Sequence, residues 1–153
     1  MTNYDSILRD VAARTLEGLA MMFLVPPDEA PARGRAVLCA GVAFSGPLQG
    51  RLVLEACPGL VRSLAGNMLG LEDHQNPSQQ QQGDALKELA NVVCGNLLPE
   101  LAGDREVFHL DAPELTARVP TEAADGQAEV AADAGWLRLR LYMKQGALLE
   151  ATP

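Results

Sequence analysis

The last strand-like run of the chain constrains the fold most, because apolar and polar residues alternate in it with a period of two. The run covers residues 136–143, and its two sets are Leu137, Leu139 and Leu141 on one face and Arg138, Arg140 and Tyr142 on the other. This period predicts a half-buried antiparallel strand whose leucine face packs on a core. Aromatic residues make up only 4% of the chain, so Leu, Val and Ala are expected to fill that core.

Three other runs place apolar residues three or four positions apart, which is the spacing of amphipathic helices. The first covers residues 5–24 and is expected to stop at the two prolines that follow, since proline removes a donor and clashes with the preceding turn. The second covers residues 58–70. The third covers residues 84–101, with Asp84 as its predicted N-cap and Pro99 expected to break or kink its last turn.

The remaining runs predict strands and one loop. Residues 36–44 and 48–56 flank a Ser-Gly-Pro turn signal and predict a β-hairpin, and residues 107–110 and 127–132 predict two further strands. Residues 72–83 contain four consecutive glutamines and are expected to form an exposed loop. At 153 residues, the chain is expected to form one α/β (α+β) domain over residues 1–153, with a mostly antiparallel sheet covered by three helices.

Charge and hydropathy exclude several classes of function. The formal net charge is -8, which disfavours nucleic acid and anionic membrane surfaces as partners. No apolar run approaches the ~20 residues of a membrane-spanning helix. The first ten residues are polar and acidic, unlike a signal peptide, so we expect a cytoplasmic protein.

The cysteines do not indicate a metal site. The three of them, Cys39, Cys57 and Cys94, lie far apart and show no spacing typical of zinc ligands. Each stands in an apolar stretch, so they are expected to be buried free thiols. No metal ligands are predicted.

A polar stripe on the third helix is the strongest candidate site. At ~100° per residue, Asp84, Glu88, Asn91 and Gly95 fall within roughly a 60° arc, opposite the leucine side of the helix. A glycine in this arc leaves a low ledge that a partner could approach closely. The alternative is an ordinary solvated helix face, although asparagine in mid-helix lowers helix propensity and counts against it.

The stripe and its surroundings resemble the CheC/CheX/FliY family of chemotaxis phosphatases. Residues 84–96, DALKELANVVCGN, are similar to the family's D/S-x-x-x-E-x-x-N signature and the Gly-Asn that follows it. The upstream FSGPLQGRLVL run resembles the family's hairpin. The first helix carries Glu17 but has Ala20 where a second copy of the motif would need Asn, so the chain resembles CheX, which has a single site, more than CheC.

The resemblance implies that the protein hydrolyses the aspartyl phosphate of a CheY-like response regulator. Glu88 would contact the regulator's active-site region, Asn91 would hold the attacking water in line, and Asp84 and Gly95 would belong to the partner-binding surface. Magnesium would be carried by the phosphorylated regulator, so the chain would need no cofactor of its own. The resemblance also implies a homodimer.

The sequence is also compatible with two other functions and with a monomer. The first rival is a non-catalytic module of the same fold that only binds a regulator or a flagellar or signalling protein. The second is a structural adaptor that assembles through its strand edges. An unpaired last strand would favour a dimer, whereas self-repulsion at a net charge of -8 favours a monomer.

Overall fold

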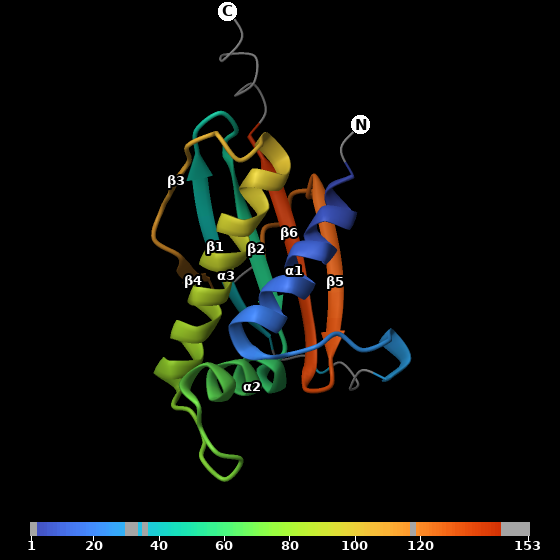
Figure 1. Cartoon of the computed structure of the whole chain (residues 1–153), viewed down its shortest axis with the longest axis vertical. Helices are drawn as coiled ribbons and strands as arrows, with labels where there is room; N and C mark the ends of the chain where they lie inside the picture. The colour runs from blue at the N-terminus through green and yellow to red at the C-terminus, as the bar shows by residue number, and fades with distance from the viewer. Residues whose placement is uncertain (1–2, 30–33, 35–36, 117–118, 145–153) are drawn as a thin grey trace, which may run out of the picture.

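The computed structural model describes residues 3–29, 34, 37–116 and 119–144, and it shows three helices packed on one face of a six-stranded antiparallel sheet (Figure 1). The sheet order is β3-β1-β2-β6-β5, and β4 also pairs with β1. The elements are α1 (Tyr4–Ala20), the 3-10 helix η1 (Pro27–Glu29), β1 (Leu38–Ser45), β2 (Gly50–Ala56), α2 (Pro58–Leu69), α3 (Gln79–Ala102), β3 (His109–Leu110), β4 (Glu114–Thr116), β5 (Gly126–Ala132) and β6 (Gly135–Met143). This arrangement confirms the α/β fold predicted from the sequence.

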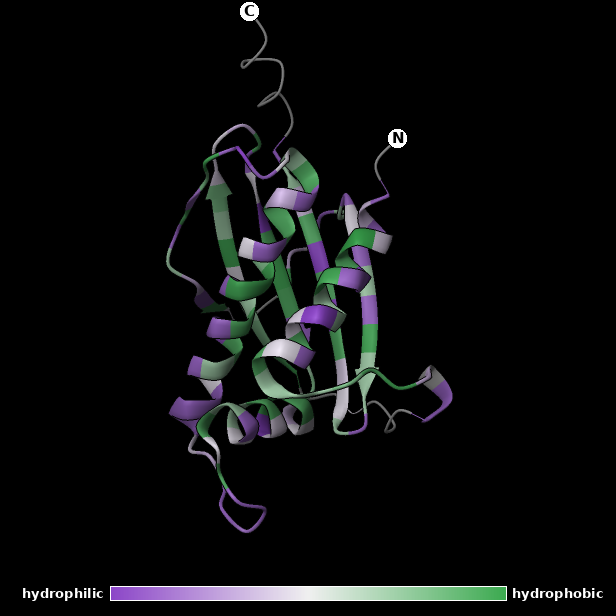
Figure 2. Ribbon diagram, in the orientation of Figure 1, coloured by the Kyte–Doolittle hydropathy of each residue, from purple (hydrophilic) through white to green (hydrophobic). Residues whose placement is uncertain are grey.

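The core lies between the helices and the sheet and consists mainly of leucine, valine and alanine. The predicted leucine face of the last strand is confirmed, because Leu137, Leu139 and Leu141 are completely buried there. Figure 2 shows the corresponding pattern on the helices, whose apolar sides turn toward the sheet and whose polar sides turn outward.

The first helix ends earlier than its apolar spacing predicts. It stops at Ala20, and the backbone N–H groups of Met21 and Met22 donate to the carbonyls of Glu17 and Leu16, which closes the last turn. The chain turns there because Met22 is drawn into the core. Phe23, which the spacing placed on the apolar face, is 61% exposed.

The third helix begins earlier than predicted, so its N-cap was wrongly assigned to Asp84. Ser78 is the N-cap: its hydroxyl accepts from the N–H of Gln81, and the Gln81 side chain accepts from the N–H of Ser78 in a capping box. The glutamine tract therefore forms the first turn of α3, since glutamine is a good helix former once a cap is present. Of the loop predicted over residues 72–83, only the part up to Ser78 lies outside a helix. Pro99 does not break the helix, which continues to Ala102.

The strands match the predictions in the centre of the sheet and differ at its border. The β1–β2 hairpin and the β5–β6 pair are confirmed, although the predicted start of the first strand, Ala36, lies outside the described residues. The strand predicted over residues 107–110 is reduced to His109–Leu110, and β4 was not predicted. The assumption that the last strand is an edge is wrong, because β6 pairs with both β2 and β5.

The sheet face opposite the helices is also largely covered. Residues 119–125 of the connection from β4 to β5 lie over this face, and the Arg51 guanidinium contacts the Glu122 carboxylate there at 2.8 Å. Beneath it, Arg138 contacts Glu55 and Glu129, each at 3.0 Å. The alternation thus located the polar face of β6 correctly. Ion pairs hold Arg138 on this face, whereas Nη1 of Arg140 and the Tyr142 hydroxyl are buried without a hydrogen bond to any described residue.

Candidate functional site

The structure places the polar stripe on the side of α3 that faces away from the sheet. Asp84, Glu88 and Gly95 are exposed, and Asn91 is partly exposed. The opposite side of the helix carries the buried residues Leu86, Leu89, Ala90, Val93 and Leu97. The stripe is therefore held in place by the packing of the helix on which it stands, and its four residues lie on one accessible surface.

Glu88 and Asn91 present unoccupied polar groups to the outside. In the described part of the chain, neither side chain makes a hydrogen bond or an ion pair. Residues three positions apart on a helix have Cβ atoms about 5–6 Å apart, so one ligand could contact both groups. Asp84 differs, because its Oδ1 lies 3.6 Å from Nζ of Lys87. The pair thus offers a carboxylate acceptor next to a carboxamide that can both accept and donate.

Gly95 keeps the C-terminal end of this surface low. No heavy atom within 4 Å would oppose a Cβ at this position, so packing does not require a glycine here. Its carbonyl also lacks one helical partner, because Pro99 has no N–H to donate to the residue four positions before it.

The hydrogen bond that joins α3 to α1 was not foreseen from the sequence. Nδ2 of Asn96 donates to Oγ1 of Thr15 at 3.1 Å, and Thr15 is buried. The signal that could have revealed it is a polar residue, Thr15, on the apolar stripe of the first helix. Asn96 therefore holds two helices together and does not extend the candidate site.

The first helix carries no second copy of the pair. Glu17 is exposed there, but Ala20, at the position corresponding to Asn91, is 2% exposed and packs in the core. A side chain at that position could not reach a partner. The geometry of α1 thus agrees with a single candidate site on α3.

The expectation of buried free thiols is confirmed for Cys39 and Cys94 and wrong for Cys57, which is only partly buried. Cys94 is completely buried on α3, and this burial raises the pKa of its thiol to about 12. Burial also raises the pKa of the Cys39 thiol. Among the described residues, no group of three or more His, Cys, Asp or Glu side chains could hold a metal ion.

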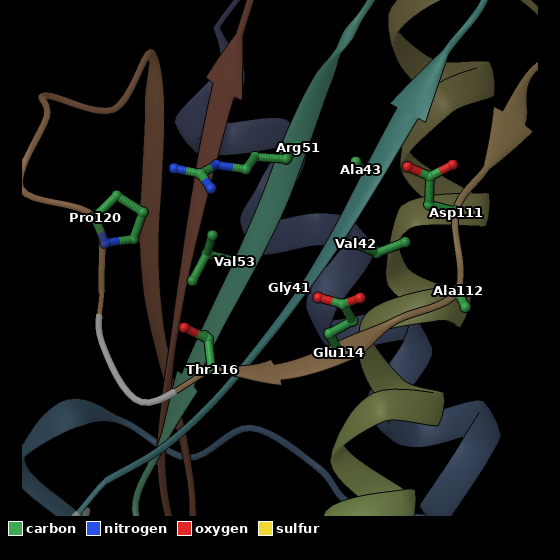
Figure 3. Close-up of a pocket in the computed structure, with 10 residues that line it drawn as sticks. All are labelled: Gly41, Val42, Ala43, Arg51, Val53, Asp111, Ala112, Glu114, Thr116 and Pro120. Carbon is green, nitrogen blue, oxygen red and sulfur yellow. The ribbon is translucent and has the colours of Figure 1, made fainter.

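A hollow of about 260 Å³ lies on the other face of the sheet, away from the stripe. Figure 3 shows Arg51, Val53, Thr116 and Pro120 around it, with Glu114 on the side of β4. Glu114 and Thr116 pair with Gly41 and Cys39, whereas Leu115 between them is paired with Ala40 on the helix side. The hollow and the candidate site are therefore separated by the sheet.

Three helices on one face of an antiparallel sheet place the chain in the class of CheX-like folds. The family model for the chemotaxis phosphatase CheX matches residues 38–133, which include β1, β2, α2 and the whole of α3. The chain belongs to the CheX family. None of the curated proteins compared with it gives a match.

Solved structures have the same fold at low sequence identity. A chemotaxis protein CheX from Desulfovibrio desulfuricans has a TM-score of 0.71 and 15% identity over 92% of this chain and 99% of that one. CheX from Vibrio vulnificus has a TM-score of 0.71 and 16% identity over 94% and 97%. CheX from Borrelia burgdorferi, solved as a CheX-CheY-BeF3-Mg complex, has a TM-score of 0.68 and 13% identity over 95% and 100%.

No helix in the described part of the chain is long and apolar enough to cross a membrane.

Proposed function

We propose that this protein is a phosphatase for the aspartyl phosphate of a CheY-like response regulator. The observation that carries the proposal is a pair of side chains one helical turn apart on α3 of a CheX-family fold. Glu88 is exposed, Asn91 is partly exposed, and neither makes a hydrogen bond or an ion pair with a described residue. The complex of the Borrelia burgdorferi relative with CheY supports a partner of this kind.

The proposed reaction is in-line attack of water on the phosphoryl group. The oxygen of the water bonds to phosphorus while the bond from phosphorus to the aspartate oxygen breaks, which leaves a free carboxylate on the regulator and releases inorganic phosphate. Asn91 orients the water through its carboxamide, and Glu88 binds a cationic group, such as a lysine, beside the regulator's phosphorylation site. Phosphoryl transfer depends mainly on positioning and charge neutralisation, so a carboxamide suffices where a strong base is absent.

The protein supplies no metal in this proposal. Magnesium is held by the regulator together with its phosphorylated aspartate, and this chain contributes α3 as the element that enters the regulator's site. Asp84 and Gly95 border the entering surface, Asp84 by its charge and Gly95 by its lack of a side chain. The proposal includes a cytoplasmic location.

The test is the dephosphorylation rate of a phosphorylated CheY-type receiver domain with and without this protein. We expect Asn91→Ala to abolish the acceleration and to leave the thermal unfolding midpoint nearly unchanged. Asn91 is partly exposed and makes no hydrogen bond with a described residue, and surface substitutions of this kind usually alter stability by no more than ~0.5 kcal/mol. Asn76→Ala, which removes an exposed carboxamide from the α2–α3 connection, is the matched control and should retain full activity. Full activity of Asn91→Ala would exclude the water-positioning role.

A non-catalytic binding module of the same fold is the alternative. It predicts that the wild-type protein binds the activated receiver but does not change its dephosphorylation rate. The adaptor alternative predicts that substitutions in the stripe affect neither binding nor the rate. One assay of each kind therefore separates the three functions.

We also propose a homodimer, on the family resemblance alone, because β6 is not the free edge on which the sequence argument depended. At one border of the sheet, β3 and β4 are only two and three residues long. At the other border, the N–H of Gln127 on β5 already donates to Oδ1 of Asp5. Light scattering at two concentrations tenfold apart tests the proposal. A mass that stays near 16.3 kDa would rule the dimer out.

A further inference from the structure

Two exposed apolar side chains flank the stripe, and neither belongs to the Glu-x-x-Asn motif. Met21 is 78% exposed at the end of α1, and Leu115 is 51% exposed on β4. Exposed apolar residues are common singly, but these two lie on opposite sides of the same helix surface. Their positions can be derived from the packing of α1 and β4 against α3.

Leu115 is fixed on the sheet-edge side of α3. It is paired with the buried residue Ala40, so its side chain points to the helix side of the sheet. There its Cδ1 lies 2.9 Å from the point that a Cβ on Gly83 would occupy. Gly83 directly precedes Asp84, so half of Leu115 packs against the start of the stripe and the other half stays open.

Met21 is fixed on the α1 side. The two helices run antiparallel, and the end of α1 lies beside the N-terminal half of α3 (Figure 1). The Thr15–Asn96 hydrogen bond sets the register. Met21 directly follows this end of α1. Asn67 of α2 also holds this end, because its Nδ2 donates to the Ala20 carbonyl at 2.9 Å, so Met21 lies on the α1 side of the N-terminal half of α3.

The backbone of Met21 is unfavourable for a residue with a side chain. Its φ of 53° and ψ of 36° place it in the left-handed region, and it is the one non-glycine residue with positive φ among those described. Glycine usually occupies this position after a helix, since a Cβ there is disfavoured. Met21 thus combines backbone strain with an exposed apolar side chain, which points to a use other than stability.

We infer that Met21 and Leu115 form two apolar docking contacts for the receiver domain, one on each side of α3. These contacts position the receiver while Glu88 and Asn91 enter its phosphorylation site. The inference rests on the proposed function, and it adds the residues through which the receiver domain is bound. Methionine suits such a contact because its unbranched, polarizable side chain adapts to irregular surfaces. The acidic stripe between the contacts favours a partner that presents a cation between two apolar contact points.

The test is the affinity for a CheY-type receiver domain activated with beryllofluoride and Mg²⁺, which measures docking without turnover. We expect Met21→Gly and Leu115→Thr each to weaken binding about three- to tenfold, and each to raise KM for the phosphorylated receiver while kcat stays within about twofold. Met21→Gly should at the same time raise the unfolding midpoint, because glycine relieves the left-handed strain. A merely structural role for Met21 would not give this combination.

Val107→Ser is the matched control, since Val107 is 84% exposed and lies beyond the far end of α3. It should leave affinity and KM unchanged. Wild-type affinity in both Met21→Gly and Leu115→Thr would overturn the inference and leave the phosphatase proposal standing. Failure of the wild-type protein to bind or dephosphorylate any CheY-type receiver, or full activity of Asn91→Ala, would instead overturn the proposed function.

Discussion

The Asn96 carboxamide donates from Nδ2 to the Thr15 hydroxyl at 3.1 Å, and this contact links the helix of the candidate site to the first helix of the chain. Thr15 is buried, whereas Asn96 stands at the exposed border between the helices. The contact fixes the position of α1 relative to α3 along the helix axes. It therefore also sets how far Met21 lies from the stripe.

Removing the Thr15 hydroxyl should cost a modest amount of stability. We expect Thr15→Val to lower the free energy of unfolding by about 0.5–1.5 kcal/mol, the net contribution of one hydrogen bond, because the exposed carboxamide of Asn96 can turn to water. Urea unfolding of Thr15→Val, Asn96→Ala and the double variant measures this. If the two single effects simply add, the side chains are not coupled and the assigned register is wrong.

Glu88 should contribute to engagement of the regulator. We expect Glu88→Ala to raise KM for the phosphorylated receiver by about tenfold or more, since hydrogen bonds between charged groups are roughly twice as strong as neutral ones. The control is Glu17→Ala, which removes another exposed glutamate, from the corresponding place on α1. If both substitutions raised KM equally, Glu88 would act only through the negative charge of the protein and not through a specific contact with the regulator.

Substitutions at Gly95 should affect stability and catalytic activity in opposite directions. We expect Gly95→Ala to stabilise the fold by up to about 1 kcal/mol, because alanine favours helix interiors and its Cβ meets no neighbour. Gly95→Leu should also fold, but its side chain would fill the ledge and lower kcat/KM sharply. Thermal unfolding and the dephosphorylation assay on both variants test this. Wild-type kcat/KM in Gly95→Leu would remove Gly95 from the partner-binding surface.

The buried thiol of Cys94 should make stability depend on alkaline pH. Its pKa is raised to about 12 in the folded protein from an ordinary value of 9.0, so the unfolded chain gives up this proton first. The stabilisation is fully present below about pH 9 and is lost as the pH rises toward about 12. In Cys94→Ala, the free energy of unfolding should fall less steeply with pH over this window. Parallel curves for the two proteins would mean that Cys94 does not contribute.

The sequence revealed most where side-chain period and burial coincide. The β6 alternation and the α3 stripe follow directly from periods of 2 and 3.6 residues, and both faces lie where these periods put them. The start of α3 was missed because composition suggested a loop, whereas the Ser78–Gln81 capping box is a local pattern that overrides composition. The end of α1 was missed because Met22 is drawn into the core.

Other features depend on tertiary contacts and could not be derived from spacing. The three residues of β4 carry too little pattern to identify, and Leu115 acquires its position only by pairing with β1. The left-handed backbone at Met21 has no signature in the residue type, since glycine or asparagine would be expected there. The interior place of β6 follows from strand order, which alternation does not encode.

Glu88 and Asn91 occupy successive turns of one helix, so local backbone hydrogen bonds alone maintain their spacing. Many active sites collect groups from distant segments and lose activity when one segment loosens at temperatures where the fold persists. Under the proposed function, this site has no such weak point, because the pair stays in register as long as α3 remains helical. At a saturating concentration of receiver, loss of the acceleration on heating should therefore coincide with loss of the helical circular dichroism signal, and the two curves should superimpose.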